Sequence, residues 1–386
     1  MLRRSTAIAI VSGSAVLAGA GVAAGFGTFR VGESHDVGAA IVYQVAVADL
    51  NGDRKGDAVA AVDAFDEGEN RVEVFLGKRD GSLRAPMVLS AGLNPEGVDI
   101  GRLNGDRRPD IAVANYSDDD VSVFIQRRNG KFRRAPDLEG GPGNWQLEIA
   151  DLNRDGRNDI VTSNYDNVAP DDAISVHLGK RQGFRPVDNY PGGQTGYGLE
   201  IGKLNGDRRP DVVGSTYQGT EGTVDTYVTR ENGTLREGNS LTLDNNSYSP
   251  LGLGDFAESK ALDAVVADYD SGSLTILAGD GTGDLAASLA PTPPVEGVWG
   301  IASGNLNGKG RADLAVNRYD DEEVQVLYGR NAGGFSAGPT YPLAHPPETV
   351  AIGRLGKDAG ADILVGTEGS LDTDGSLDTF LNKRNP

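Results

Sequence analysis

The chain has 386 residues, of which 38% are apolar and 24% charged, and its formal net charge is −20. The 55 glycines are about twice the usual share and indicate many turns. The negative charge repels phosphate backbones, so we expect no nucleic acid partner. The absence of cysteine excludes disulfides, thiolate metal sites and cysteine nucleophiles.

The N-terminal segment has the composition of a secretion signal. Residues 1–24 combine two arginines with a weakly apolar run, and the small residues Val22 and Ala24 suit cleavage after Ala24. We therefore expect a signal peptide over 1–24, a secreted or cell-surface location, and no membrane insertion after cleavage. The alternative is an uncleaved anchor, which the short run broken by Gly and Ser disfavours.

One unit, a strand followed by an acidic loop, then recurs seven times. The first copy reads VAVADLNGDRKGD at 45–57, and all seven copies end in Asp. The apolar anchors of the loops are spaced by 53, 49, 52, 52, 50 and 49 residues, and they are Leu50, Leu103, Leu152, Leu204, Phe256, Leu306 and Leu355. Three further strand-like runs follow each loop, so each unit predicts four strands. Periods near 50 residues are typical of propeller blades, and the fold class we predict is all-β, a seven-bladed β-propeller.

The two ends of the repeated region complement each other. After the run at 377–382 the seventh unit lacks its fourth strand, whereas GTFRV at 27–31 has that strand's signature. We expect 27–34 to pair with 377–382 and close the ring, since an open ring would leave an unpaired edge. The sequence therefore predicts one domain over 27–386.

Two of the acidic loops carry oxygen side chains at their first, third, fifth and ninth positions. They are Asp49, Asn51, Asp53 and Asp57 in the first unit, and Asp151, Asn153, Asp155 and Asp159 in the third. Calcium takes six to eight oxygen ligands, so we expect two calcium ions that stabilise the loops. A metal-free Asx-turn is the alternative. In the second, fourth and seventh units Arg102, Lys203 and Arg354 replace the first acid, and such a cation can balance the remaining carboxylates.

Two recurring positions are expected at the end of the ring opposite the acidic loops. Seven residues before the anchors stand Tyr43, Glu96, Trp145, Tyr197, Ser249, Trp299 and Glu348. Six residues after the terminal aspartates stand Asp63, Tyr116, Tyr165, Tyr217, Tyr269, Tyr319 and Glu368. Aromatic faces suit sugar rings or cationic side chains, so Tyr43, Trp145, Tyr197 and Trp299 are candidate ligand-binding residues. Packing over the blade corners is the alternative.

Three adjacent units also place acids near the axis, four residues before their anchors. These are Asp99, Glu148 and Glu200, which we take as candidate ligand-binding residues for a cation or basic group, with separate solvated acids as the alternative. The three histidines, His35, His177 and His345, stand in no recognisable nucleophile motif. Hydrolysis by carboxylates alone stays open.

With these motifs together, the chain resembles the FG-GAP and VCBS-type repeat proteins, which include the propeller head of integrin α subunits. LNGD with the terminal Asp carries the resemblance, which covers about 27–386. It implies a secreted or surface location, calcium in the loops and a role in binding or adhesion, although five of the seven loops lack a full ligand set. We expect a monomeric, non-enzymatic module for a glycan or an extracellular protein. The alternative is a polysaccharide-active lyase or hydrolase that uses the axial acids.

Overall fold

The computed structural model describes residues 29–64, 70–166, 172–193, 195–217, 221–243, 250–258, 261–269, 271–357, 360–370 and 372–382. The signal peptide expected over 1–24 lies outside these ranges, as does Ser249, which stands seven residues before the fifth anchor. The regular structure within them is all β. No helix long and apolar enough to cross a membrane occurs among these residues.

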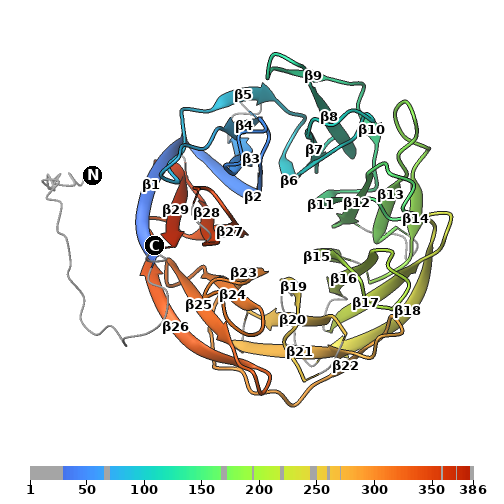
Figure 1. Ribbon diagram of the computed structural model, residues 1–386, viewed down its shortest axis with the longest axis vertical. Coiled ribbons are helices and arrows are strands. Elements are labelled where there is room, and N and C mark those ends of the chain that lie inside the picture. The colour runs from blue at the N-terminus through green and yellow to red at the C-terminus, as the bar shows by residue number, and fades with distance from the viewer. Residues whose placement is uncertain are drawn as a thin grey trace, which may run out of the picture.

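Seven antiparallel sheets stand around a common axis as the blades of a propeller (Figure 1). The inner strands are β2 (Ala40–Ala48), β6 (Pro95–Gly101), β11 (Asn144–Ala150), β15 (Thr195–Gly202), β19 (Leu251–Gly254), β23 (Val298–Gly304) and β27 (Pro347–Gly353). The second strands are β3 (Asp57–Ala64), β7 (Asp110–Asn115), β12 (Asp159–Asn164), β16 (Asp211–Tyr217), β20 (Asp263–Asp268), β24 (Asp313–Arg318) and β28 (Asp362–Thr367). The predicted all-β, seven-bladed fold is confirmed.

Two further layers complete each blade. The third strands are β4 (Arg71–Phe75), β8 (Asp120–Gln126), β13 (Ile174–His177), β17 (Gly222–Thr229), β21 (Ser273–Gly279), β25 (Glu323–Gly329) and β29 (Gly375–Asn382). The outer strands are β5 (Met87–Ser90), β9 (Phe132–Arg134) with β10 (Leu138–Glu139), β14 (Asp188–Tyr190), β18 (Leu235–Leu243), β22 (Leu285–Ala287), β26 (Phe335–Pro342) and β1 (Phe29–Gly38). In the second blade β9 and β10 both pair with β8, because Pro136 between them has no N–H to continue the ladder.

The core lies between consecutive blades. The second strands are buried on both faces: all six residues of β7, DIAVAN, and of β12, DIVTSN, are inaccessible. Such runs, continuous in small and β-branched residues, suit a strand that is covered on both sides. Each of the seven apolar clusters among the described residues joins two neighbouring blades, as where Val59 and Val72 pack against Val98 and Phe124. The stability of each blade therefore depends on its neighbours.

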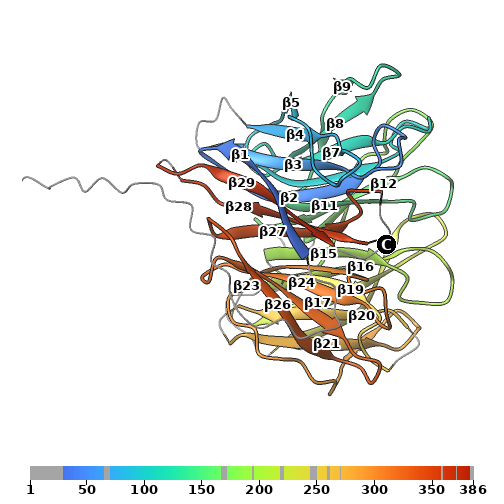
Figure 2. The ribbon, with the colours of Figure 1, turned by 60° about the vertical axis from the view of Figure 1, so that its left-hand side comes forward.

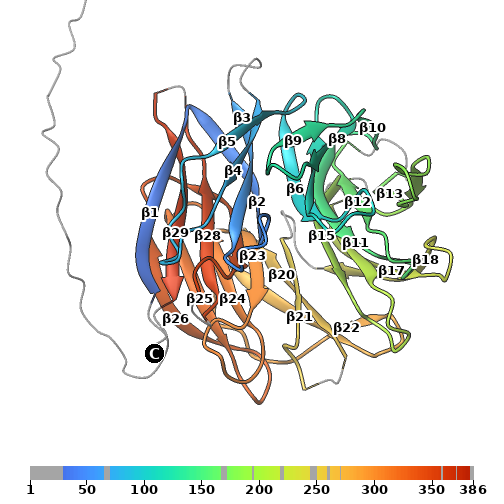
Figure 3. The same ribbon diagram turned by 45° about the horizontal axis from the view of Figure 1, so that its top comes forward.

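Strand β1 closes the ring as the fourth strand of the last blade. It pairs antiparallel with β29, with Phe29 opposite Asn382 and Ser34 opposite Asp378. Figures 2 and 3 show β1, in blue, beside β29, in red. The Thr379 hydroxyl accepts a hydrogen bond from Glu33 N at 2.9 Å and donates one to Glu33 O at 3.0 Å. The predicted closure is confirmed from residue 29 onward, and residues 27 and 28 lie outside the described ranges.

Candidate functional site

The two recurring positions meet at one end of the ring. The Trp145 ring of β11 stacks on Tyr165, with centroids 4.9 Å apart and planes inclined by 28°. Across the propeller axis, the ring centroids of Trp299 of β23 and Tyr319 lie 5.5 Å apart. Both tryptophans stand at the starts of inner strands, and the acidic loops follow the far ends of those strands. Three more rings contact Trp145 at centroid distances of 5.8, 6.1 and 6.3 Å, namely Tyr43, Tyr116 and Tyr197.

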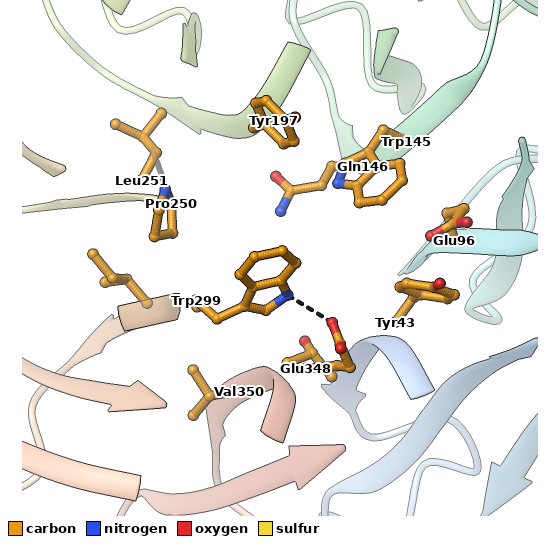
Figure 4. Close-up of a pocket in the computed structure, with 13 residues that line it drawn as sticks. Tyr43, Glu96, Trp145, Gln146, Tyr197, Pro250, Leu251, Trp299, Glu348 and Val350 are labelled. Atoms are coloured by element: carbon orange, nitrogen blue, oxygen red, sulfur yellow. Dashed lines mark hydrogen bonds between the residues drawn. The ribbon is translucent and has the colours of Figure 1, made fainter. Parts of the chain in front are cut away.

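A cavity of about 80 Å³ lies among these residues (Figure 4). Its lining, which we call the mouth, comprises Tyr43, Glu96, Trp145, Gln146, Tyr197, Pro250, Leu251, Trp299, Gly300, Ile301, Glu348, Thr349 and Val350. The mouth includes four aromatic residues and two acids but no Lys, Arg or His. Pockets that engulf a drug-sized molecule occupy about 300–1,000 Å³, so this cavity admits a head group rather than a whole ligand.

Acids from blades seven, one and two lie on one side of the mouth or next to it. There Glu348, Glu368, Asp63 and Glu96 stand at the positions that hold aromatic residues in most other blades. Trp299 Nε1 donates a hydrogen bond of 2.6 Å to Glu348 Oε2 (Figure 4). Burial, with the nearby Glu368 carboxylate, raises the pKa of Glu348 to about 7. Sequence reasoning did not select Glu96 and Glu348, although the replacement of an aromatic by an acid at an equivalent position was a usable signal.

Glu96 is the most enclosed of these acids. Its side chain is 6% exposed, and its Oε2 has no hydrogen-bond partner among the described residues. Burial raises the pKa of Glu96 well above its ordinary value, and the carboxylates of Asp63 and Glu348 raise it further. The pKa of the Tyr43 hydroxyl, which faces the same acids, is raised as well, mainly by burial. The mouth therefore brings acids together, and no basic residue lines it among the described residues.

The tyrosines that stand six residues after the terminal aspartates also connect neighbouring blades. Tyr116 donates to Asp166 at 2.7 Å, and Tyr269 donates to Asp320 at 2.8 Å, each across about one repeat of sequence. Tyr319 donates to Glu368 in the same manner. These three tyrosines pack against Trp145 or Trp299, and they lie outside the lining of the cavity.

The axial acids lie three residues further along the inner strands and outside the mouth. Asp99 accepts a hydrogen bond of 2.8 Å from Ile149 N of the next blade, and Glu148 accepts one of 3.0 Å from Ile201 N. Burial raises the pKa of Asp99 to about 6 and that of Glu200 to about 8. Burial also raises the pKa of Glu148 well above its ordinary value, and the neighbouring Glu200 and Asp99 carboxylates raise it further. Asp99 and Glu148 thus join inner strands.

At the other end of the ring, the aspartate that closes each acidic loop serves the backbone. In every blade one oxygen accepts the N–H of the loop's apolar anchor and the other accepts an N–H at the end of the third strand, over 2.7–3.1 Å. The seven aspartates are Asp57, Asp110, Asp159, Asp211, Asp263, Asp313 and Asp362. We call this arrangement the clamp. It explains why all seven loops keep this residue while the other ligand positions vary.

The first and third loops fold around their own N–H groups. Asp49 Oδ1 accepts Gly52 N at 2.7 Å and Asp53 N at 3.0 Å, and its Oδ2 accepts Arg54 N at 2.8 Å. In the third loop Asp151 accepts Asp155 N at 3.0 Å and Gly156 N at 2.9 Å, and Gly156 adopts a φ of +84° that favours glycine.

The positive charge in these loops comes from the seventh position. Lys55 pairs with Asp53 in the first loop, and Arg157 pairs with Asp155 at 2.8 Å in the third. Arg108 and Arg209 pair with Asp106 and Asp207 in the second and fourth. Arg102, Lys203 and Arg354, expected to supply this charge, are exposed and form no ion pair within the described part of the chain.

The donor set of the first and third loops suits calcium, which prefers carboxylate and amide oxygens. Asp49, Asn51 and Asp53 would hold the ion in one loop, and Asp151, Asn153 and Asp155 in the other. Asp57 and Asp159 would contribute only through oxygens that already accept N–H groups of the clamp. Within the described ranges no three His, Asp or Glu side chains converge as a metal-binding group. To bind calcium the loops must therefore rearrange and release their seventh-position cations.

Comparison with known families agrees with this architecture. A family model for the FG-GAP-like repeat matches residues 49–113 and 102–162, which span the acidic loops of the first three blades. The clamp shows that the remaining blades repeat the same unit. The protein is a seven-bladed β-propeller with FG-GAP-like repeats in its first three blades. No curated protein matches the sequence of this FG-GAP propeller.

Solved structures resemble the FG-GAP propeller in fold. BBS1N, in complex with ARL6DN, has a TM-score of 0.58 at 16% identity, covering 93% of this chain and 98% of that one. Hydrazine synthase of Kuenenia stuttgartiensis has a TM-score of 0.56 at 12% identity, covering 85% and 92%. Apo ctPRC2 has a TM-score of 0.58 at 8% identity, covering 92% and 98%. At such identities the likeness shows the fold alone.

Proposed function

We propose that this FG-GAP propeller is a secreted, calcium-stabilised, non-enzymatic module that binds a glycan or an extracellular protein through its mouth. The observation that carries the proposal is the small cavity lined by Tyr43, Trp145, Tyr197 and Trp299 at the axis of the ring. Aromatic faces bury large areas against sugar rings and side chains, and aromatic residues are enriched among binding hot spots. FG-GAP-type propellers are in general binding or adhesion modules.

Secretion and calcium have support in the sequence. The leader-like composition of residues 1–24 suits export. The first and third acidic loops offer Asp and Asn oxygens at calcium-like spacing. Calcium in this proposal holds the loops and supplies no chemistry.

The rival function is a polysaccharide lyase or hydrolase that uses Asp99, Glu148 and Glu200. Their raised pKa values are of a kind found in general acids. However, both oxygens of Asp99 accept backbone N–H groups, from Ile100 and from Ile149 of the next blade. Such bonds hold the carboxylate in place between strands, so we favour binding over catalysis.

A binding screen tests the proposal. The mature protein is applied to a glycan array and to a panel of extracellular proteins, and each hit is measured again with Trp145→Ala. We expect at least a tenfold loss of affinity, because truncating a central aromatic contact costs about 1.4 kcal/mol or more. Phe132→Ala, on the outer strand β9, is the control and should bind normally.

Two results would contradict the proposal. One is binding that survives both Trp145→Ala and Trp299→Ala in folded protein. The other is release of reducing ends or unsaturated products from a glycan hit, with turnover abolished by Glu148→Gln, which would favour the enzyme.

A further inference from the structure

The mouth contains a buried acceptor that is left without a donor. Glu96 is 6% exposed, and its Oε2 lacks a hydrogen-bond partner among the described residues. An unsatisfied buried polar atom costs about 1–3 kcal/mol, and such atoms are rare in folded proteins. Since Glu96 lines the cavity, a ligand that donates N–H or O–H groups can satisfy this oxygen.

Charge narrows the class of ligand. Tyr43 lies between Glu96 and Glu348 (Figure 4), and the carboxylates of Asp63 and Glu368 act on the same site. Among the described residues, no basic side chain lines the cavity. A neutral sugar hydroxyl could donate to Glu96 but would gain nothing from the neighbouring acids, whereas a cation satisfies the acceptor and is also attracted by the carboxylates that form as it binds.

The aromatic residues narrow the class of ligand further. The rings of Tyr43 and Trp145 lie 5.8 Å apart, and Trp299 lines the same cavity. Ring faces attract organic cations through their quadrupole. A cavity of about 80 Å³ takes an ammonium head group while the rest of the ligand lies outside.

We propose that the mouth binds a protonated primary amine, which donates hydrogen bonds to Glu96 and Glu348 while its carbon atoms contact Tyr43, Trp145 and Trp299. A quaternary ammonium carries no N–H and cannot satisfy the free oxygen of Glu96, so the site selects for primary amines. This inference rests on the proposed binding function and names the chemistry of its ligand.

Calorimetric titration of the mature protein tests the selectivity. The probes are n-butylammonium, tetramethylammonium and n-butanol, at low ionic strength and neutral pH. We expect butylammonium to bind at least tenfold more tightly than tetramethylammonium, and butanol to show no binding. Equal affinity for the two cations, or tighter binding of butanol, overturns the inference.

Variants locate the site. Glu96→Gln keeps the shape of the side chain but cannot ionise, and we expect at least a tenfold loss of butylammonium affinity. The control is Glu73→Gln, which changes an equally buried acid, 5% exposed, that pairs with Arg71 away from the mouth. An equal loss in the control means that the effect is general electrostatics and refutes the assignment to Glu96.

A measurement on the unaltered protein guards against variants that fail to fold. Burial raises the pKa of Glu96, and that of Glu348 to about 7. A cation bound beside these acids, which also face Asp63, Glu368 and Tyr43, lowers both pKa values and so releases protons. The apparent binding enthalpy should therefore depend on the ionisation enthalpy of the buffer and show net proton release. An enthalpy independent of buffer contradicts the inference.

Two further probes identify the source of the amine. Glucosamine carries the ammonium on a sugar ring, and Nα-acetyl-lysine methylamide carries it on a protein side chain. Binding of either supports the inference, and the tighter of the two names the source. If no amine binds while the array yields a ligand sensitive to Trp145→Ala, this inference fails and the proposed function stands. If the array also yields nothing sensitive to that variant, both fail.

Discussion

At the scale of single residues, the aspartate of the clamp satisfies two buried N–H groups with one side chain. Asp110 accepts Leu103 N at 3.0 Å and Gln126 N at 2.8 Å, and it is fully buried. Burial raises the pKa of Asp110 to about 6, although the two N–H donors act in the opposite direction. The carboxylate thus ties the loop to the end of the third strand without a metal ion.

We expect Asp110→Asn to lower the free energy of unfolding by about 1–3 kcal/mol, because the amide leaves one buried N–H without an acceptor. Urea denaturation in the presence of chelator measures it. The matched control is Asp106→Asn in the same loop, whose partly exposed pair with Arg108 should contribute less than about 1 kcal/mol. An equal cost in both variants would contradict the clamp.

The clamp also explains a residue-level limit of the sequence analysis. The spacing correctly identified Asp57 and Asp159 as parts of a recurring loop, but a ligand pattern and a backbone-binding pattern place an acid at the same position. Only coordinates show which N–H groups face it. The retention of this aspartate in all seven loops, including those without other ligands, was the available signal for a structural role.

At the scale of elements, the repeat predicted most of the blade strands and the closing pair, because period and alternation directly reflect blade size and burial. It predicted one outer strand in each blade and missed the division into β9 and β10, where Pro136 acts locally against the repeat. The aromatic residues of the mouth could also be predicted from the repeat, because equivalent positions of the blades converge at one end of the ring. The unpaired oxygen of Glu96 could not be predicted from the sequence, because hydrogen-bond partners depend on side-chain packing that the spacing of residues does not encode.

Only the first and third acidic loops have a full set of candidate calcium ligands, so substitutions in these loops and in the others should affect calcium binding differently. We expect millimolar calcium to raise the melting temperature by several degrees over chelated protein, since a ligand that binds only the folded state stabilises it by about 2.7 kcal/mol at a hundredfold excess over Kd. The combination Asp53→Asn with Asp155→Asn should abolish this rise. Its control, Asp106→Asn with Asp207→Asn, changes the same position in the second and fourth loops and should keep it. Absence of both a calcium shift and bound metal in elemental analysis would mean that the loops are turns only.

At the scale of the whole molecule, the ring concentrates acids with raised pKa values around its axis. Asp99, Glu148 and Glu200 come from three adjacent blades, and Glu348 from the last. Neighbouring blades bring Asp99, Glu148 and Glu200 together, and the closed ring brings Glu348 near Glu96, although the acids of each group are remote from one another in sequence. The effect of these acids on the pH dependence of stability is therefore a property of the whole ring and not of any one blade.

The expected consequence is a stability that falls as pH rises from about 5 to 8. Unfolded Asp and Glu titrate near pH 4, whereas folded Asp99 and Glu200 titrate near 6 and 8, so in this window the native state binds more protons than the unfolded chain. The free energy of unfolding then decreases with pH, because its slope follows the protons bound by the unfolded state minus those bound by the native state. Urea denaturation at fixed ionic strength, with chelator present, measures this slope. Glu148→Gln can still accept the N–H of Ile201 while removing an acid whose pKa burial and Glu200 raise, so it should flatten the slope and raise stability at pH 8 by roughly 1 kcal/mol. Glu139→Gln, on the exposed strand β10, should leave the slope unchanged, and a stability that rises with pH in the unaltered protein would show that the axial acids are ionised in the native ring.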